Sequence, residues 1–194
     1  MMSAVSMPIG EATIGPFFPG AYVDAGANDL TRWQGRSAQG QLIDIRGRVT
    51  EDEGVPLQNV VLEIWQADAN GIYRHPADPR AKHADADFFG WGRAATDADG
   101  AFHFRTIMPG RTHLPNGTLR APHINVVVLA SGLMRQLQTV MFFEGNAANA
   151  TDAVLACVHP AAFQEALIAK ADGPRKYRFD IRLCGADETP FFED

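Results

Sequence analysis

Cysteine and lysine are scarce in this sequence, and it has no long apolar run. Cysteine occurs only at Cys157 and Cys184, too few for a disulfide scaffold, so we expect two free thiols in a reducing compartment. No stretch approaches the roughly 18 apolar residues of a membrane span. Residues 1–20 also lack the basic and apolar parts of a signal peptide. We therefore expect a soluble, cytoplasmic protein with no membrane partner.

Basic residues are fewer than acidic residues in this sequence. The chain has 17 lysine and arginine residues against 23 aspartate and glutamate residues, a net charge of −6. Because nucleic acid is bound through basic surfaces, we do not expect it as a partner. The sequence also has no His-Glu-x-x-His, Gly-x-Gly-x-x-Gly, Walker or Gly-x-Ser-x-Gly motif. Zinc hydrolysis, dinucleotide binding, phosphoryl transfer and serine hydrolysis are therefore not indicated.

The sequence does have many short apolar runs, separated by 18 glycines and 12 prolines. We expect strands over 42–49, 59–68, 123–130, 137–143 and 176–183, a hairpin over 91–107 with its turn at Asp99-Gly100, and short helices over 151–158 and 159–170. Thr151 or Asp152 is the expected cap of the first helix. This series of short strands is typical of a sandwich or barrel.

The length of 194 residues suggests one folded domain. We predict an all-β fold, an immunoglobulin-like or prealbumin-like β-sandwich with long loops, one or two short helices and an extended N-terminal arm. The arm is assigned to residues 1–40 and the sandwich to residues 41–194. Residues 67–92 are too long for a hairpin loop, and loops of this size usually carry function or make contacts.

Several segments together resemble the intradiol ring-cleaving dioxygenases, and among them the two-chain branch that acts on protocatechuate. They are "EIWQADANGIYRHP" (63–76), "GRAATDADGAFHFRTIMPG" (92–110), "RAPHINVVV" (120–128) and "MFFEG" (141–145). The resemblance runs from about Thr13 to Leu183, nearly the whole chain. It implies a non-haem Fe(III) enzyme whose metal is held by two tyrosinates and two histidines. Phenolates are hard anionic ligands that favour ferric iron, which acts as Lewis acid and template.

Only part of that ligand set is present. By the resemblance, Tyr73 and His123 match one tyrosine and one histidine ligand, and Arg120 matches the arginine beside the iron. Thr112 stands where the second tyrosine is expected, and Asn125 where the second histidine is expected. A hydroxyl and a neutral amide do not replace a phenolate and an imidazole on ferric iron. We therefore interpret these positions as a degenerate iron site with no metal on this chain.

The resemblance also offers an explanation for the two missing iron ligands. In the protocatechuate branch an α chain pairs with a homologous β chain that holds the iron, and αβ protomers build a larger oligomer. This chain resembles the α chain, and its segment "TIGPFFPG" resembles the arm that lines the partner's substrate pocket, through Thr13, Gly15 and Pro16. The implied reaction converts protocatechuate and O2 to 3-carboxy-cis,cis-muconate in aromatic degradation by the β-ketoadipate pathway.

Two alternatives remain. A self-sufficient enzyme would have to hold iron or another metal through Tyr73 and His123, with His113 as a further ligand one residue from the expected position. A β-sandwich binding or structural module, like transthyretin-type carriers, would need no catalytic partner. Metal bound to the isolated chain would indicate the self-sufficient enzyme. Co-purification with an iron-binding homologue would indicate the α chain and not the module without a catalytic partner.

Overall fold

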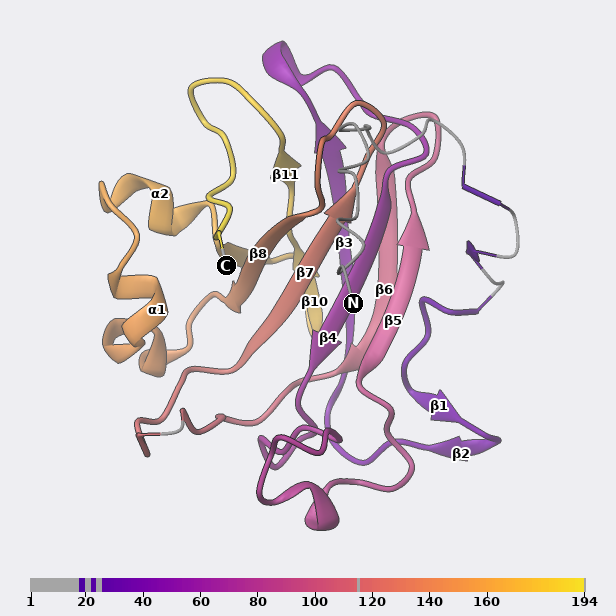
Figure 1. Ribbon diagram of the computed structural model, residues 1–194, viewed down its shortest axis with the longest axis vertical. Coiled ribbons are helices and arrows are strands. Elements are labelled where there is room, and N and C mark those ends of the chain that lie inside the picture. The colour runs from indigo at the N-terminus through magenta and orange to yellow at the C-terminus, as the bar shows by residue number, and fades with distance from the viewer. Residues whose placement is uncertain (1–17, 20–21, 24–25, 115, 194) are drawn as a thin grey trace, which may run out of the picture.

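The computed structural model describes residues 18–19, 22–23, 26–114 and 116–193, and Figure 1 shows their arrangement. The strands are β1 (Arg32–Trp33), β2 (Arg36–Ser37), β3 (Leu42–Thr50), β4 (Val61–Gln66), β5 (Trp91–Ala95), β6 (Ala101–Ile107), β7 (His123–Leu129), β8 (Leu137–Phe143), β9 (Ile168–Ala171), β10 (Lys176–Arg178) and β11 (Ile181–Arg182). The helices are α1 (Ala153–Ala156) and α2 (Ala162–Glu165), with 3-10 turns η2 (Asp52–Gly54), η3 (Ala81–His83) and η4 (Ala147–Thr151).

The strands form two layers. Strands β5, β4, β7 and β8 pair in that order, each antiparallel to the next. In the other layer β3 pairs antiparallel with β6 and parallel with β10 and β11. Strand β9 joins the layers at one side, parallel to β8 and antiparallel to β10. Helices α1 and α2 lie beside β8 (Figure 1). The β-sandwich expected from the sequence is confirmed.

The core lies between the layers, where alternate side chains of facing strands meet. One apolar cluster contains Leu62 and Ile64 of β4, Ile124, Val126 and Val128 of β7, Ile43 and Ile45 of β3, and Phe102 and Phe104 of β6. Because the alternation has a period of two, the residues between them point outward, and Trp65 on β4 is 38% exposed. The outer face of the β4–β7–β8 layer is therefore available for a site.

The hairpin expected over 91–107 is wrong, although its turn is correctly placed. Strand β5 pairs with β4, whereas β6 pairs with β3 in the other layer. Gly100, with φ of +69°, closes the turn by donating its N–H to the carbonyl of Asp97. The strands separate after the turn because each completes a different sheet, so the turn crosses from one layer to the other.

Residues 27–30 fill the space between β5 and β6. The carbonyl of Ala27 accepts the N–H of Arg93 at 2.9 Å, and the N–H of Leu30 donates to the carbonyl of Arg105 at 2.8 Å. The side chain of Leu30 is buried in the core. This short segment is thus hydrogen-bonded to the outermost strand of each layer on this side.

Two expectations near the C-terminus need correction. The helix expected over 159–170 is limited to α2, and β9 follows it, because Ile168 and Ala169 pair with Phe142 and Phe143 of β8. The strand expected over 176–183 is divided into β10 and β11. The expected cap at Asp152 is confirmed, since its carboxylate accepts the N–H groups of Val154 and Leu155.

Two absences concern only the residues that the structure describes. None of their helices is long and apolar enough to cross a membrane. Cys157 and Cys184 are both free thiols, as expected. Thr13, Gly15 and Pro16, expected to reach a partner's pocket, lie outside the described residues, so their role remains a prediction.

Candidate functional site

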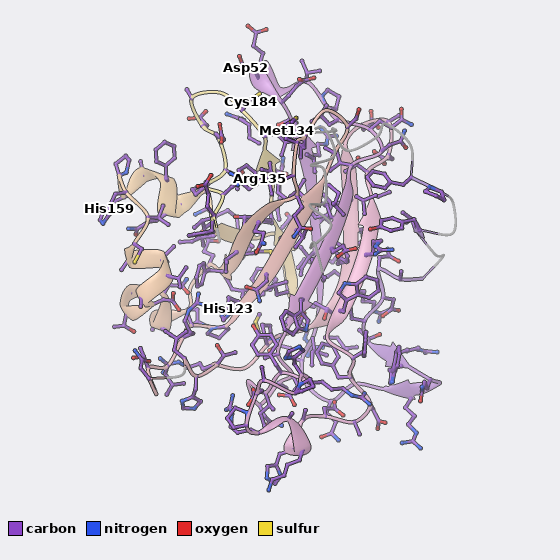
Figure 2. The ribbon with its side chains drawn as sticks, in the orientation of Figure 1. Asp52, His123, Met134, Arg135, His159 and Cys184 are labelled. Carbon is purple, nitrogen blue, oxygen red and sulfur yellow. The ribbon has the colours of Figure 1, made fainter. Side chains whose placement is uncertain are left out.

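The residues matched to the iron site gather at one end of the sandwich, where the long loop after β4 meets the start of β7. Figure 2 shows His123 at this end, whereas Asp52, Met134, Arg135 and Cys184 lie toward the opposite end and His159 lies on the helical side. Three of the expected residues, Tyr73, His123 and Asn125, are in direct contact here. His123 and Asn125 are two residues apart on β7 and therefore share one face.

The phenol oxygen of Tyr73 is the centre of this contact. It lies 3.3 Å from Nε2 of His123, and Nδ2 of Asn125 donates to it across 3.1 Å. The same Nδ2 also donates to the carbonyl of Trp65 at 3.2 Å. The Trp65 ring packs against Tyr73 with 4.9 Å between centroids. Tyr73 is therefore fixed by two side chains of β7 and by one aromatic neighbour on β4.

The hydrogen bonds define the protonation of the pair. Nδ1 of His123 lies 2.7 Å from the carbonyl of Ala121, which can only accept, so Nδ1 carries the proton. In a neutral imidazole Nε2 then has the lone pair, and the phenol of Tyr73 donates to it. The lone pair that would bind a metal is thus occupied by the Tyr73 proton.

Burial keeps both groups neutral. It raises the pKa of the Tyr73 phenol, more than the hydrogen bond from Asn125 and the positive charge of Arg120 lower it. Burial, followed by the charge of Arg120, lowers the pKa of His123 from 6.5 to about 4. A ferric site needs an ionised phenolate and a free imidazole lone pair. A cation would have to displace the phenol proton that the two side chains share, and Thr112 and Asn125 offer a hydroxyl and an amide at the other two matched positions. A donor set of one phenol, one imidazole, one hydroxyl and one amide does not fit Fe(III).

Arg120 is held by a buried ion pair with Asp152, the residue that caps α1. Its Nε donates to Oδ2 of Asp152 at 2.9 Å, and the N–H of Ala121 donates to the same oxygen at 2.8 Å. Burial alone would raise the pKa of Asp152, but the Arg120 hydrogen bond and the two backbone N–H bonds lower it overall. Among the described residues, Nη2 of Arg120 has no hydrogen-bond partner. The ion pair ties the start of β7 to the helical side.

Asp68 and Asp78 shape the loop that carries Tyr73. The buried carboxylate of Asp68 accepts the N–H groups of Asn70, Ile72 and Asp85. The carboxylate of Asp78 accepts the N–H of Tyr73 at 3.1 Å. Burial alone would raise the pKa of Asp78, but hydrogen bonds from the Arg80 and Tyr73 backbones and the Arg80 side chain lower it. The two aspartates thus fix the loop on both sides of Tyr73.

The loop also packs closely on the segment after β6. Gly71 has φ of +73°, and a Cβ placed there would lie 1.8 Å from the carbonyl oxygen of Arg111. The N–H of Gly110 donates to the carbonyl of Asp68. Only glycine allows this approach of the two backbones. The contact brings the loop against the segment that contains Thr112.

Thr112 and His113 lie on this neighbouring segment. The carbonyl of Thr112 accepts the N–H of Arg120 at 2.8 Å, and the Thr112 residue is buried. His113 lines a pocket of about 480 Å³ together with Tyr73, His75 and Arg80. Within the described part of the chain, no three histidine, cysteine, aspartate or glutamate residues are grouped so that they could hold a metal ion.

A larger cleft lies on the outer face of the layer, next to Asn125. It has a volume of about 770 Å³ and is lined by Trp65, Phe89, Trp91, Val127, Val140 and Phe192 among others. We call it the aromatic cleft. Phe89 is 41% exposed, and the third tryptophan, Trp33, stacks on it at 4.5 Å. All three tryptophans of the chain thus line or border one cleft.

Sequence reasoning missed the residues that support the site. Trp65 was expected only as part of the strand over 59–68, and Asp152 only as a helix cap. Asp68 carried a usable signal, because an aspartate two residues before Asn70-Gly71 is typical of a side-chain-stabilised turn. The partner of Arg120 had no such signal, since 32 residues separate it from Asp152.

Comparison with known proteins identifies relatives of this chain. A family profile described as Dioxygenase matches residues 14–185. The chain is 38% identical to the protocatechuate 3,4-dioxygenase α chain of Pseudomonas putida, over 80% of this chain and 78% of that one. It is 34% identical to the β chain of Burkholderia cepacia, over 84% of this chain and 74% of that one.

Solved structures show the same fold. The dioxygenase domain of a dioxygenase carbohydrate-binding protein fusion from Streptomyces sp. SirexAA-E aligns with a TM-score of 0.60 and 30% identity, over 93% of this chain and 100% of that one. The 3-chlorocatechol 1,2-dioxygenase of Rhodococcus opacus 1CP aligns with a TM-score of 0.62 over 90% of this chain and 71% of that one. The chain belongs to the intradiol ring-cleaving dioxygenase family. Within that family it is similar to α chains of protocatechuate 3,4-dioxygenase.

Proposed function

We propose that this chain is the non-catalytic α subunit of a protocatechuate 3,4-dioxygenase. A homologous β chain holds Fe(III) and cleaves 3,4-dihydroxybenzoate with O2 to 3-carboxy-cis,cis-muconate. This chain contributes to the walls of the substrate pocket and to the assembly of αβ protomers in a larger cytoplasmic oligomer. The proposed arm, residues 1–40, supplies Thr13, Gly15 and Pro16 to the partner's pocket, and residues 41–194 form the sandwich domain.

The hydrogen bond between Tyr73 and His123 carries the proposal. These are the two side chains that match iron ligands, and each satisfies the other, with the phenol proton on the imidazole lone pair. Asn125 turns its amide nitrogen, which is a donor and not a ligand, toward the same phenol. An enzyme of this family without its own metal needs a partner that supplies one. Identity to an α chain supports the same conclusion.

The direct test is to purify this chain alone and together with the β-type homologue from the same source. We expect no iron and no visible colour from the isolated chain. The complex should contain about one iron per pair, show the red-brown absorption of ferric tyrosinate, and consume O2 with protocatechuate. Near-stoichiometric iron and colour on the isolated chain would mean that Tyr73 and His123 bind the metal, and the proposal would be wrong. Failure to form any complex would favour a binding or structural module.

A further inference from the structure

We propose that the aromatic cleft is a binding site for a small phenol of about two fused rings. The rings lie on the aromatic side chains of the cleft, and the phenol hydroxyl donates to Oδ1 of Asn125. The site belongs to this chain alone and needs neither a metal nor a partner chain. It therefore does not rest on the proposed function and is tested separately from it.

The strand register places the aromatic side chains and Asn125 in one row. Trp91 of β5 is directly opposite Trp65 of β4, and Trp65 is directly opposite Asn125 of β7. Asn125 is in turn opposite Val140 of β8. All four residues line the cleft. Because neighbouring strands are about 4.7–4.9 Å apart, two indoles and one amide follow one another across roughly 10 Å. A flat molecule that covers Trp91 and Trp65 therefore brings its edge to Asn125.

The amide of Asn125 is held so that its oxygen remains available to a ligand. Its Nδ2 donates to the carbonyl of Trp65 at 3.2 Å and to the phenol oxygen of Tyr73 at 3.1 Å. A backbone carbonyl can only accept, so the amide atom on this side is the nitrogen, and the other atom is Oδ1. No described residue donates to Oδ1. Oδ1 is thus an oriented acceptor for a donor group on an occupant.

The histidine of the cleft favours a hydroxyl as that donor. His75 packs edge-on against Trp65, with 5.5 Å between ring centroids, and its Nδ1 accepts the N–H of Ala77 at 3.1 Å. In the neutral imidazole the proton is therefore on Nε2, which donates. A hydroxyl can donate to Asn125 and also accept from such a group, whereas an ammonium or indole N–H group can only donate.

The acidic and arginine side chains of the cleft disfavour a cation as occupant. Glu63 lines the cleft and forms an ion pair with Arg93. Arg74 also lines it, and its guanidinium donates to the carbonyl of Ala86 but pairs with no carboxylate of the described residues. The charge that remains is therefore positive. A neutral phenol is compatible with this charge, whereas an ammonium group would be repelled by it.

The size of the cleft fits two rings better than one. Its volume of about 770 Å³ lies within the roughly 300–1,000 Å³ of small-molecule sites and well above the roughly 150 Å³ of a cavity that holds benzene. Trp65 and Phe89 are 38% and 41% exposed, so a bound ring system would bury large apolar side chains that are now open to water. Burial of this apolar surface supplies the affinity, and the hydrogen bond to Asn125 supplies the selectivity.

Isothermal titration calorimetry of the full chain with 2-naphthol and its methyl ether, 2-methoxynaphthalene, tests the proposal. The two probes have the same rings, but only naphthol has a donor. We expect naphthol to bind the wild-type chain about tenfold more tightly than the ether does, and Asn125→Ala to reduce this ratio to about one. Equal affinities of the two probes for the wild-type chain would overturn the proposal, as would no binding of naphthol up to its solubility limit.

A second measurement locates the bound naphthol. Val127 lines the cleft, so we expect Val127→Arg to weaken naphthol binding at least tenfold. The control Val55→Arg, at a residue that is 49% exposed outside the lining, should leave it unchanged. All three tryptophans line or border the cleft, so naphthol should also shift their indole N–H signals in the NMR spectrum of the wild-type chain. Circular dichroism confirms that each variant is folded.

The outcomes that contradict the site are distinct. Unchanged affinity in Val127→Arg, or indole signals that do not shift, would mean that naphthol binds elsewhere, and the proposal would be wrong. If naphthol does not bind and Val127→Arg lowers the mass of the isolated chain in sedimentation, a second copy of this chain covers the cleft, and the proposal is likewise wrong. None of these results depends on whether an iron-binding homologue pairs with this chain.

Discussion

The side chains of Tyr73 and His123 are hydrogen-bonded to each other, with 3.3 Å between the phenol oxygen and Nε2. Two groups that would both face a metal in a ferric site are instead turned to one another. Asn125 completes this arrangement by donating to the phenol. Tyr73, His123 and Asn125 therefore form a closed polar network, and its properties can be tested by substitution.

Replacing Asn125 with histidine should create a metal site. The new imidazole shares a strand face with His123 and lies beside Tyr73, which gives a Tyr-His-His set suited to Zn²⁺ or Ni²⁺. We expect Asn125→His to raise the affinity for Zn²⁺ at least tenfold by isothermal titration calorimetry. Asn125→Gln, which keeps the amide, should show no gain, and adding Tyr73→Phe should remove most of it. Equal affinity in all variants would show that the three side chains do not converge.

The buried Arg120–Asp152 pair should be sensitive to loss of one partner. Asp152→Asn leaves a buried guanidinium without its counter-charge, which typically costs about 3–5 kcal/mol in the free energy of unfolding. The matched control is Asp187→Asn, because Asp187 pairs with Arg182 and its side chain is 81% exposed. We expect that control to change stability by less than about 1 kcal/mol. Urea denaturation of both variants measures the difference.

Stability should fall with acid because His123 is held neutral. Its pKa is lowered from 6.5 to about 4, so as the pH falls below 6.5 the unfolded chain takes up a proton that the folded chain does not. The stabilisation is complete above pH 6.5 and is lost progressively down to about pH 4, a loss of about 3 kcal/mol at 1.36 kcal/mol per pKa unit. The free energy of unfolding, measured across this pH range, should depend less on pH in His123→Gln than in the wild type. His83→Gln, an exposed control, should keep the wild-type dependence. If His123→Gln keeps the wild-type dependence of the unfolding free energy on pH, another group is responsible for the loss of stability in acid.

Gly71 should tolerate no side chain. Gly71→Ala introduces a Cβ about where the carbonyl of Arg111 lies, in addition to the positive-φ penalty. Gly117→Ala is the control, because Gly117 also has positive φ, at +83°, but no atom of the described residues lies within 4 Å of the position that its Cβ would take. We expect the control to cost about 1–2 kcal/mol and Gly71→Ala to cost clearly more in thermal denaturation. Similar losses would mean that the loop can move away from Arg111.

The sequence predicted the sandwich because alternation decides which strand face is buried, as at Leu62 and Ile64 against Trp65. It did not predict that β5 and β6 belong to different layers, because the Asp97–Gly100 turn has the same local chemistry whether or not its strands stay paired. Strand β9 was missed for a related reason, since its pairing depends on partners distant in the chain.

The candidate site, like the fold, was predicted from the sequence only in part. Tyr73, His123 and Asn125 were identified from motifs, and the structure brings them into contact. The resemblance alone indicated that two ligands had been replaced, but not that the remaining two satisfy each other. That depends on the proton on Nδ1 of His123 and hence on the carbonyl of Ala121. Three aspartates support the site through long-range or backbone contacts, which a motif does not encode. They are Asp68, Asp78 and Asp152.

The segment around Ala27 has a practical consequence for shortening the chain. It occupies the hydrogen-bonding edge of β5 through Arg93 and that of β6 through Arg105. A deletion that stops before Gly26 keeps both edges covered, whereas one that extends past Leu30 exposes two strands with unpaired N–H and carbonyl groups. Exposed edges of this kind recruit strands from other molecules and lead to aggregation. Removal of the proposed arm should therefore end before Gly26, well short of residue 40, if its role in partner binding is to be separated from simple insolubility.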